Sequence, residues 1–78
     1  MRPVHQIAEA ILADWTNPPP EAMTCIQAMQ ELAHIDDPYV DDDAYTIVSY
    51  FLARAGRWSG PVARATKAEL LALLRAAA

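Results

Sequence analysis

The side chains best suited to catalysis or metal binding are few, and they are scattered along the chain. Cys25 falls in the middle of a predicted helix, while His5 and His34 fall near the ends of predicted helices. A catalytic nucleophile needs a neighbouring base, and a structural zinc site needs four clustered Cys or His ligands. The chain has one Cys and two His. We therefore expect a protein that is not an enzyme and needs no metal or cofactor, with Cys25 as a small buried apolar residue.

A run of acidic residues is the strongest local signal. Residues 36–43 include five aspartates, which are Asp36, Asp37, Asp41, Asp42 and Asp43. A calcium-binding loop of the EF-hand type alternates its carboxylates and has a Gly at its sharp turn, and this run has neither feature. Two interpretations remain open. The run is either a solvated turn that caps the next helix through Asp42 or Asp43, or an acidic recognition surface for a basic partner.

Two further side chains extend this candidate recognition surface. Tyr39 lies within the acidic run and offers a rigid amphipathic contact of the kind enriched at protein interfaces. Glu31, near the end of the preceding predicted helix, adds another carboxylate. The predicted partner-binding residues are Glu31, Asp36, Asp37, Tyr39, Asp41, Asp42 and Asp43.

The formal net charge of −4 conceals a separation of charge along the chain. Residues 1–45 carry nine acidic residues and one basic residue, whereas residues 46–78 carry one acidic and five basic residues. The bases that flank the Gly-containing connector at 58–61 are Arg54, Arg57, Arg64 and Lys67. A helix, such a connector and a second helix resemble a helix-turn-helix, so the alternative function is a small DNA-binding or transcription-regulating protein. The acidic net charge argues against it, and the bases can instead neutralise the acidic half.

The length of 78 residues indicates a single domain over residues 1–78. No apolar run reaches the roughly 18 residues that a membrane span needs. The first apolar stretch is interrupted by His5, Gln6 and Glu9, which is unlike a signal peptide. One Cys cannot form an intrachain disulfide, which fits a reducing compartment. We therefore expect a cytoplasmic protein.

Hydrophobic periodicity and helix-breaking residues predict four helices. They cover residues 3–15, 20–34, 43–55 and 61 to the C-terminus, separated by prolines, the acidic run and Gly56. Residues 45–51 are rich in β-branched and aromatic side chains, so a strand is the rival interpretation there. Residues 66–69 match a capping box, which allows the last helix to break or restart at Thr66. The predicted fold class is all-α, a compact four-helix domain with short connections.

The periodic positions also predict the core. The residues expected to pack inward are Ile7, Ile11, Leu12, Trp15, Phe51, Leu52, Leu70, Leu73 and Leu74. Trp15 and Trp58 are most simply buried or half-buried packing residues.

Several stretches give the chain a resemblance to a known group of proteins. They are Ile47-Val48-Ser49-Tyr50-Phe51-Leu52, Trp58-Ser59-Gly60-Pro61-Val62-Ala63-Arg64 and Lys67-Ala68-Glu69-Leu70, with Asp14-Trp15 and Ala28-Met29 fitting the same pattern. In them the chain resembles short proteins carried by phages and mobile elements of proteobacteria. Its size and acidity are similar to those of small anti-CRISPR proteins, including inhibitors of type I-C systems.

The resemblance implies an inhibitor that acts in the cytoplasm of the host bacterial cell. Its partner would be a CRISPR type I surveillance complex, whose recognition of DNA it would prevent. Anti-CRISPR proteins share no common motif, so the resemblance assigns no functional residues. CRISPR effectors hold nucleic acids in channels lined by Lys and Arg, and an acidic loop can occupy such a channel. The expected partner is therefore a protein surface, with neither nucleic acid nor membrane bound directly.

Overall fold

Proline and aspartate residues set where the helices begin. The computed structural model describes residues 2–77. Within these residues the helices are α1 (Val4–Asp14), α2 (Pro20–Met29), α3 (Ala44–Arg54) and α4 (Pro61–Ala77). Proline at the first position of a helix loses no hydrogen bond, which fits the starts of α2 and α4. α3 begins directly after Asp43, whose carboxylate accepts a hydrogen bond from the Thr46 amide at 2.8 Å.

The acidic run forms a small β-hairpin. Strand β1 (Pro38–Tyr39) pairs antiparallel with β2 (Asp42–Asp43), and Tyr39 lies opposite Asp42. The turn between the strands is formed by Val40 and Asp41, and Val40 has a φ of 51°. The fold is therefore mostly helical, and the predicted all-α class is correct except for this hairpin.

The predicted end of the second helix at residue 34 is wrong, because α2 ends at Met29. Beyond it the backbone turns toward the start of α1. The carbonyls of Leu32 and Ala33 accept hydrogen bonds from the amides of His5 and Val4, at 2.8 and 3.0 Å. Amides in the first turn of a helix have no partner within that helix, so residues 32–33 satisfy two of them. A longer α2 would lose this connection.

Helices α3 and α4 are both continuous. Residues 44–54 form α3, so the strand interpretation of residues 45–51 is wrong. The buried positions Ala44, Ile47, Val48 and Phe51 follow the 3–4 spacing of one helical face. α4 runs without a break through Thr66, which is buried, so the capping box at 66–69 does not restart the helix.

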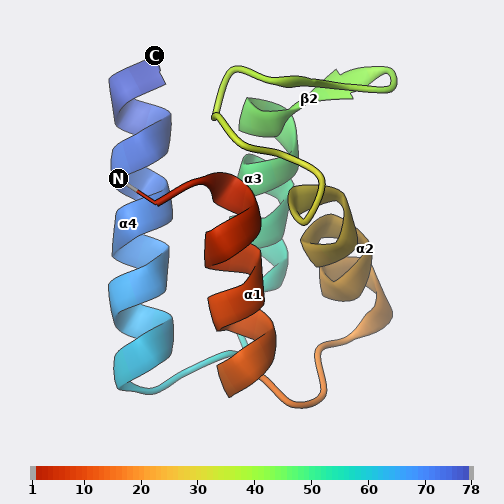
Figure 1. Ribbon diagram of the computed structural model, residues 1–78. Helices are drawn as coiled ribbons and strands as arrows, with labels where there is room; N and C mark the ends of the chain where they lie inside the picture. Colours follow the sequence, from red (N-terminus) through yellow and green to blue (C-terminus); the bar gives the residue numbers. More distant parts are fainter. Residues whose placement is uncertain (1, 78) are drawn as a thin grey trace.

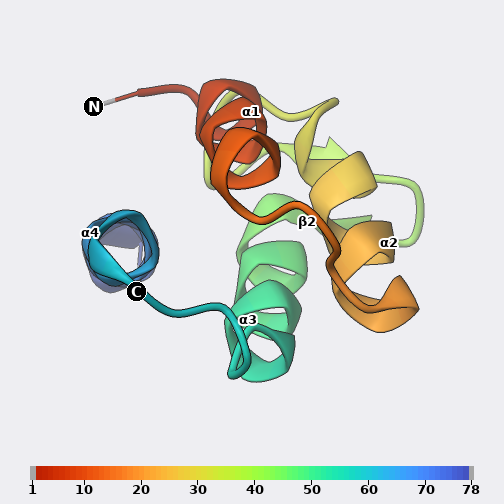
Figure 2. The ribbon, with the colours of Figure 1, turned by 90° about the horizontal axis from the view of Figure 1, so that it is seen from below.

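The core lies between the four helices, each of which packs on two of the others. α2 packs on α1 and α3 from one side, and α4 packs on the same two helices from the other (Figure 2). The predicted core residues are confirmed, with burial of Ile7, Ile11, Phe51, Leu70 and Leu73 and partial burial of Leu12, Trp15, Leu52 and Leu74. None of the helices in residues 2–77 is long and apolar enough to cross a membrane.

The path of the chain places two connections at opposite ends of the molecule. The hairpin leads into the start of α3 at the top of Figure 1, and the connector from α3 to α4 lies at the bottom. The 11 residues of α3 separate them by about 16 Å, at 1.5 Å per residue. The acidic hairpin and the basic connector are thus held apart by a rigid element.

Candidate functional site

The candidate site is residues 36–43, called the acidic hairpin below. Asp37 ties its first end to the preceding turn, because its Oδ2 atom accepts hydrogen bonds from the amides of His34 and Ala33, both at 2.9 Å. The Asp37 carbonyl also accepts from the Ala44 amide at 2.8 Å, which links the two ends of the hairpin. The hydrogen bonds from His34 and Ala33 lower the pKa of Asp37 below its ordinary value. Asp37 is therefore a structural residue.

Asp43 holds the other end of the hairpin. It is the N-cap of α3, which confirms that one of the two predicted aspartates caps this helix. The hydrogen bond from the Thr46 amide lowers the pKa of Asp43, since it stabilises the ionised carboxylate. Two of the five aspartates are thus explained by turn and capping chemistry.

Tyr39 and Glu31 fasten the hairpin to the rest of the domain. The half-buried Tyr39 ring packs against the core, and its hydroxyl donates a hydrogen bond to Glu31 Oε2 at 3.1 Å. This hydrogen bond to a carboxylate raises the pKa of Tyr39. Tyr39 therefore acts first as an anchor within the protein, while Glu31 stays exposed just beyond the end of α2.

The side chains of Asp36, Asp41 and Asp42 remain free. All three are exposed, and none has an ion-pair partner among residues 2–77. Val40 lies in the turn that joins the two strands, and it is 87% exposed. Its backbone has a left-handed conformation that β-branched residues rarely adopt. The predicted surface thus separates into residues that hold the hairpin and three free carboxylates, of which Asp36 lies at the base of the hairpin and Asp41 and Asp42 lie at its tip beside Val40. Sequence reasoning missed Val40, because neither its type nor its neighbours indicate a positive φ.

The charge separation of the sequence is sharper in the structure. Within residues 2–77 the one ion pair joins Arg2 to Glu69 at 2.6 Å. Arg2 is the single base of residues 1–45, and Glu69 is the single acid of residues 46–78. The only base of the first half and the only acid of the second half therefore neutralise each other, which leaves free acids in one half and free bases in the other. Among residues 2–77 no base of the second half forms a direct ion pair with an acid of the first half.

Two of the four basic residues around the connector serve the structure. Lys67 Nζ donates a hydrogen bond to the Trp58 carbonyl at 2.6 Å. Arg54 donates to the Tyr50 carbonyl at 3.2 Å, and its guanidinium lies 4.9 Å from the centre of the Tyr50 ring. Only Arg57 and Arg64 are exposed with no such contact in the described part of the chain.

An aromatic cluster fixes the basic end of the molecule. Trp15 and Trp58 stack with ring centres 5.7 Å apart, and Phe51 meets both rings edge-on. The Trp58 indole donates a hydrogen bond to Asp14 Oδ2 at 2.9 Å. Packing roles were predicted for both tryptophans, but the link to Asp14 has no signal in the sequence, since 44 positions separate the two residues.

The residues considered for catalysis remain dispersed. Cys25 is buried as predicted, and burial raises the pKa of its thiol, which disfavours the reactive thiolate. His5 lies in the first turn of α1, and His34 lies in the turn that Asp37 holds. Among residues 2–77 no three side chains of His, Cys, Asp or Glu are placed to share a metal ion.

Comparison with known proteins gives no relative. The chain matches no protein-family model, no curated protein and no solved structure.

Metal independence is a direct prediction of this arrangement. Calcium or zinc at about 1 mM should leave the melting temperature unchanged, because a ligand stabilises a protein only when it binds the folded state preferentially. Differential scanning fluorimetry with and without chelator measures this. A rise in melting temperature that the chelator reverses would show a metal site.

Acid should weaken the anchoring of the hairpin. Asp37 and Asp43 have lowered pKa values, so their contribution to stability is present above about pH 4 and is lost as the pH falls through their lower folded pKa values. The double variant Asp37→Ala/Asp43→Ala should melt at a lower temperature than the parent at pH 7, and this gap should be smaller at pH 2. Asp41→Ala, which removes a free carboxylate, is the control and should show no gap at pH 7. An equal gap at both pH values would contradict these roles.

Proposed function

We propose that this chain is a protein-binding inhibitor that places its acidic hairpin on a basic nucleic-acid-binding surface of a CRISPR type I surveillance complex and so blocks recognition of DNA. The observation that carries the proposal is the free charge of the hairpin. Asp36 at its base and Asp41 and Asp42 at its tip are exposed without ion-pair partners in residues 2–77, and the 87% exposed Val40 adjoins Asp41. The choice of a CRISPR complex follows the resemblance to anti-CRISPR proteins.

The charge of the tip suits a surface that normally binds phosphates. Lys and Arg side chains that line a nucleic-acid channel attract carboxylates as they attract the phosphate backbone. Complementary charge speeds the encounter of two proteins and selects their orientation. Arg57 and Arg64, the free bases around the connector, lie about one helix length from the hairpin. Arg75, in the last turn of α4, is the exposed base at the hairpin end, where Asp36, Asp41 and Asp42 outnumber it and keep the local charge negative.

The anchoring of the hairpin supports the same role. Asp37, Asp43 and the Tyr39–Glu31 hydrogen bond hold a segment that would otherwise be a flexible loop. A contact surface that is already ordered loses less conformational entropy on binding, so more of the interaction energy is left for affinity.

The alternative of a DNA-binding protein has less support. Lys67 and Arg54 are engaged by backbone carbonyls, which leaves few free bases around the connector. The net charge of −4 also opposes an approach to the phosphate backbone.

The test is a DNA-binding assay with a purified type I-C surveillance complex. Fluorescence anisotropy reports binding of labelled target DNA as the protein is added. We expect the complex to lose DNA binding, while the protein alone leaves the anisotropy of free DNA unchanged. A protein that binds the free DNA and leaves the complex active would replace the proposal with the DNA-binding function.

A further inference from the structure

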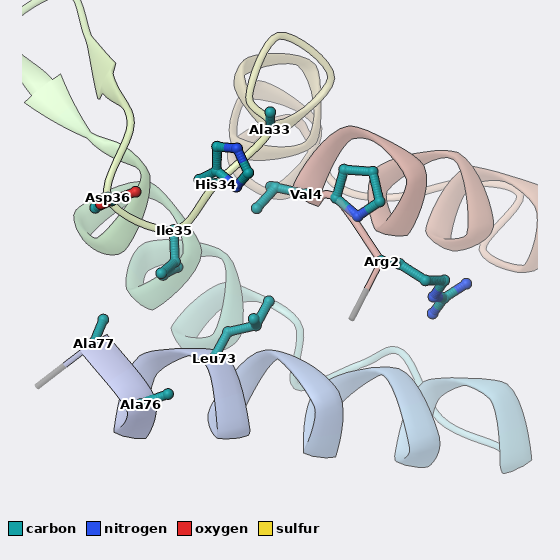
Figure 3. Close-up of a pocket in the computed structure, with 10 residues that line it drawn as sticks. Arg2, Val4, Ala33, His34, Ile35, Asp36, Leu73, Ala76 and Ala77 are labelled. Carbon is teal, nitrogen blue, oxygen red and sulfur yellow. The ribbon is translucent and has the colours of Figure 1, made fainter.

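A groove adjoins the acidic hairpin at the same end of the molecule. It has a volume of about 680 Å³ and lies between the start of α1, residues 33–36 and the last turns of α4 (Figure 3). Ligand pockets commonly fall between about 300 and 1,000 Å³. The groove therefore has room for one or two side chains of a partner protein.

The walls of the groove are mainly apolar. Ile35 and Leu73 face it from opposite walls, Val4 lines it from the start of α1, and Ala33, Ala76 and Ala77 leave space because their side chains are short (Figure 3). Such walls favour an aliphatic side chain, whose burial is worth roughly 25 cal/mol per Å² of apolar surface.

The two charged residues of the groove lie at opposite ends of it and differ in availability (Figure 3). Arg2 is bound by Glu69 through two contacts, at 2.6 and 3.2 Å. Asp36 is exposed and has no ion-pair partner within residues 2–77. A ligand in the groove therefore meets a free negative charge at one end and a neutralised positive charge at the other.

We infer that the groove receives an apolar side chain of the partner together with an adjacent Lys or Arg, whose cation meets Asp36. The inference rests on the proposed function, because Asp36 belongs to both the groove and the acidic hairpin. It adds a specificity element: the partner surface is basic and also presents an aliphatic residue next to the base. A nucleic-acid channel that lacks such a residue would be bound less tightly.

A peptide titration followed by ¹⁵N NMR tests the groove without the surveillance complex. The probe is acetyl-Leu-Leu-Arg-amide, and the comparison peptides are acetyl-Leu-Leu-Glu-amide and acetyl-Gly-Gly-Arg-amide. We expect saturable shifts of the amides of Val4, Ile35 and Leu73 with the probe, and affinity about tenfold weaker for either comparison peptide, since tenfold corresponds to one good contact. Equal shifts with all three peptides, or none with the probe, would overturn the inference.

Two variants separate the groove from the hairpin. Ala76→Trp places a large ring in the groove from an exposed position, so the fold should be kept and binding of the probe lost. Asp41→Asn/Asp42→Asn removes hairpin charge outside the groove and should leave probe binding unchanged. Loss of probe binding in this double variant would contradict the groove assignment. Because the probe assay omits the complex, failure of the groove and failure of the proposed function give different results.

Discussion

Replacing Phe51 with Ala should lower the free energy of unfolding by about 3–5 kcal/mol. The Phe51 side chain is fully buried, and its ring centre lies 6.4 Å from that of Trp15 and 6.3 Å from that of Trp58. Its removal leaves a cavity and breaks two edge-on aromatic contacts. A chain of 78 residues has a total stability of about 4–12 kcal/mol, so this one change removes a large share of it. Urea denaturation followed by circular dichroism measures the loss.

Tyr50→Ala is the matched control for Phe51→Ala. Tyr50 is the preceding residue of α3, but its side chain is 48% exposed and contacts Arg54 at the surface. We expect its loss to cost under about 1 kcal/mol. Similar costs for the two variants would show that the aromatic cluster is not packed as described.

Replacing the three free aspartates with asparagine should weaken binding to the type I-C surveillance complex by about 30-fold or more. The triple variant is Asp36→Asn/Asp41→Asn/Asp42→Asn, and it keeps Asp37 and Asp43 because these residues hold the hairpin. Its melting temperature should stay close to that of the parent, since exposed charges contribute little to stability. Binding of the parent protein should also weaken with salt, because exposed charges are screened over about 8–10 Å at ordinary ionic strength. Surface plasmon resonance at two salt concentrations measures both effects.

The control for the triple variant changes the opposite end of the molecule. Arg57→Ala/Arg64→Ala removes the two exposed bases around the connector that lack contacts within residues 2–77. This double variant should bind the complex as the parent does. If it loses binding and the triple variant keeps it, the contact lies at the basic end and the acidic-hairpin mechanism is wrong.

The helices could be predicted because local rules specify them. Pro20, Pro61 and Asp43 mark helix starts whose chemistry involves only neighbouring residues. The ambiguity over residues 45–51 arose because the types of side chain favoured a strand while their spacing favoured a helix. The cap at Asp43 and the buried face of α3 decided in favour of the spacing.

The end of α2 could not be predicted, because its cause is distant in the sequence. Residues 32 and 33 leave the helix to accept hydrogen bonds from the amides of Val4 and His5. Thr66 shows the opposite case: a local capping pattern is overridden because the residue is buried within a continuous α4. In both places tertiary contacts outweigh local preference.

The sequence indicated where the candidate site lies, but not which of its carboxylates anchor the segment and which are free. The run of aspartates indicated an unusual acidic segment, but nothing in it indicated that the segment forms a hairpin. The division between anchoring and free carboxylates depends on how the backbone turns around Asp37 and Asp43. The groove could not be predicted from the sequence, since it is formed by three segments that come together only in the fold.

The proposed function requires the tip of the acidic hairpin to touch the nucleic-acid-binding surface of the partner. A photocrosslinking amino acid in place of Val40, which is 87% exposed, tests this contact directly when the protein is irradiated with the type I-C surveillance complex. We predict a covalent product with a subunit that lines the DNA channel, and loss of this product when target DNA is bound first. The same amino acid in place of Arg57 should give no such product. Crosslinking from position 57 and none from position 40 would contradict the account.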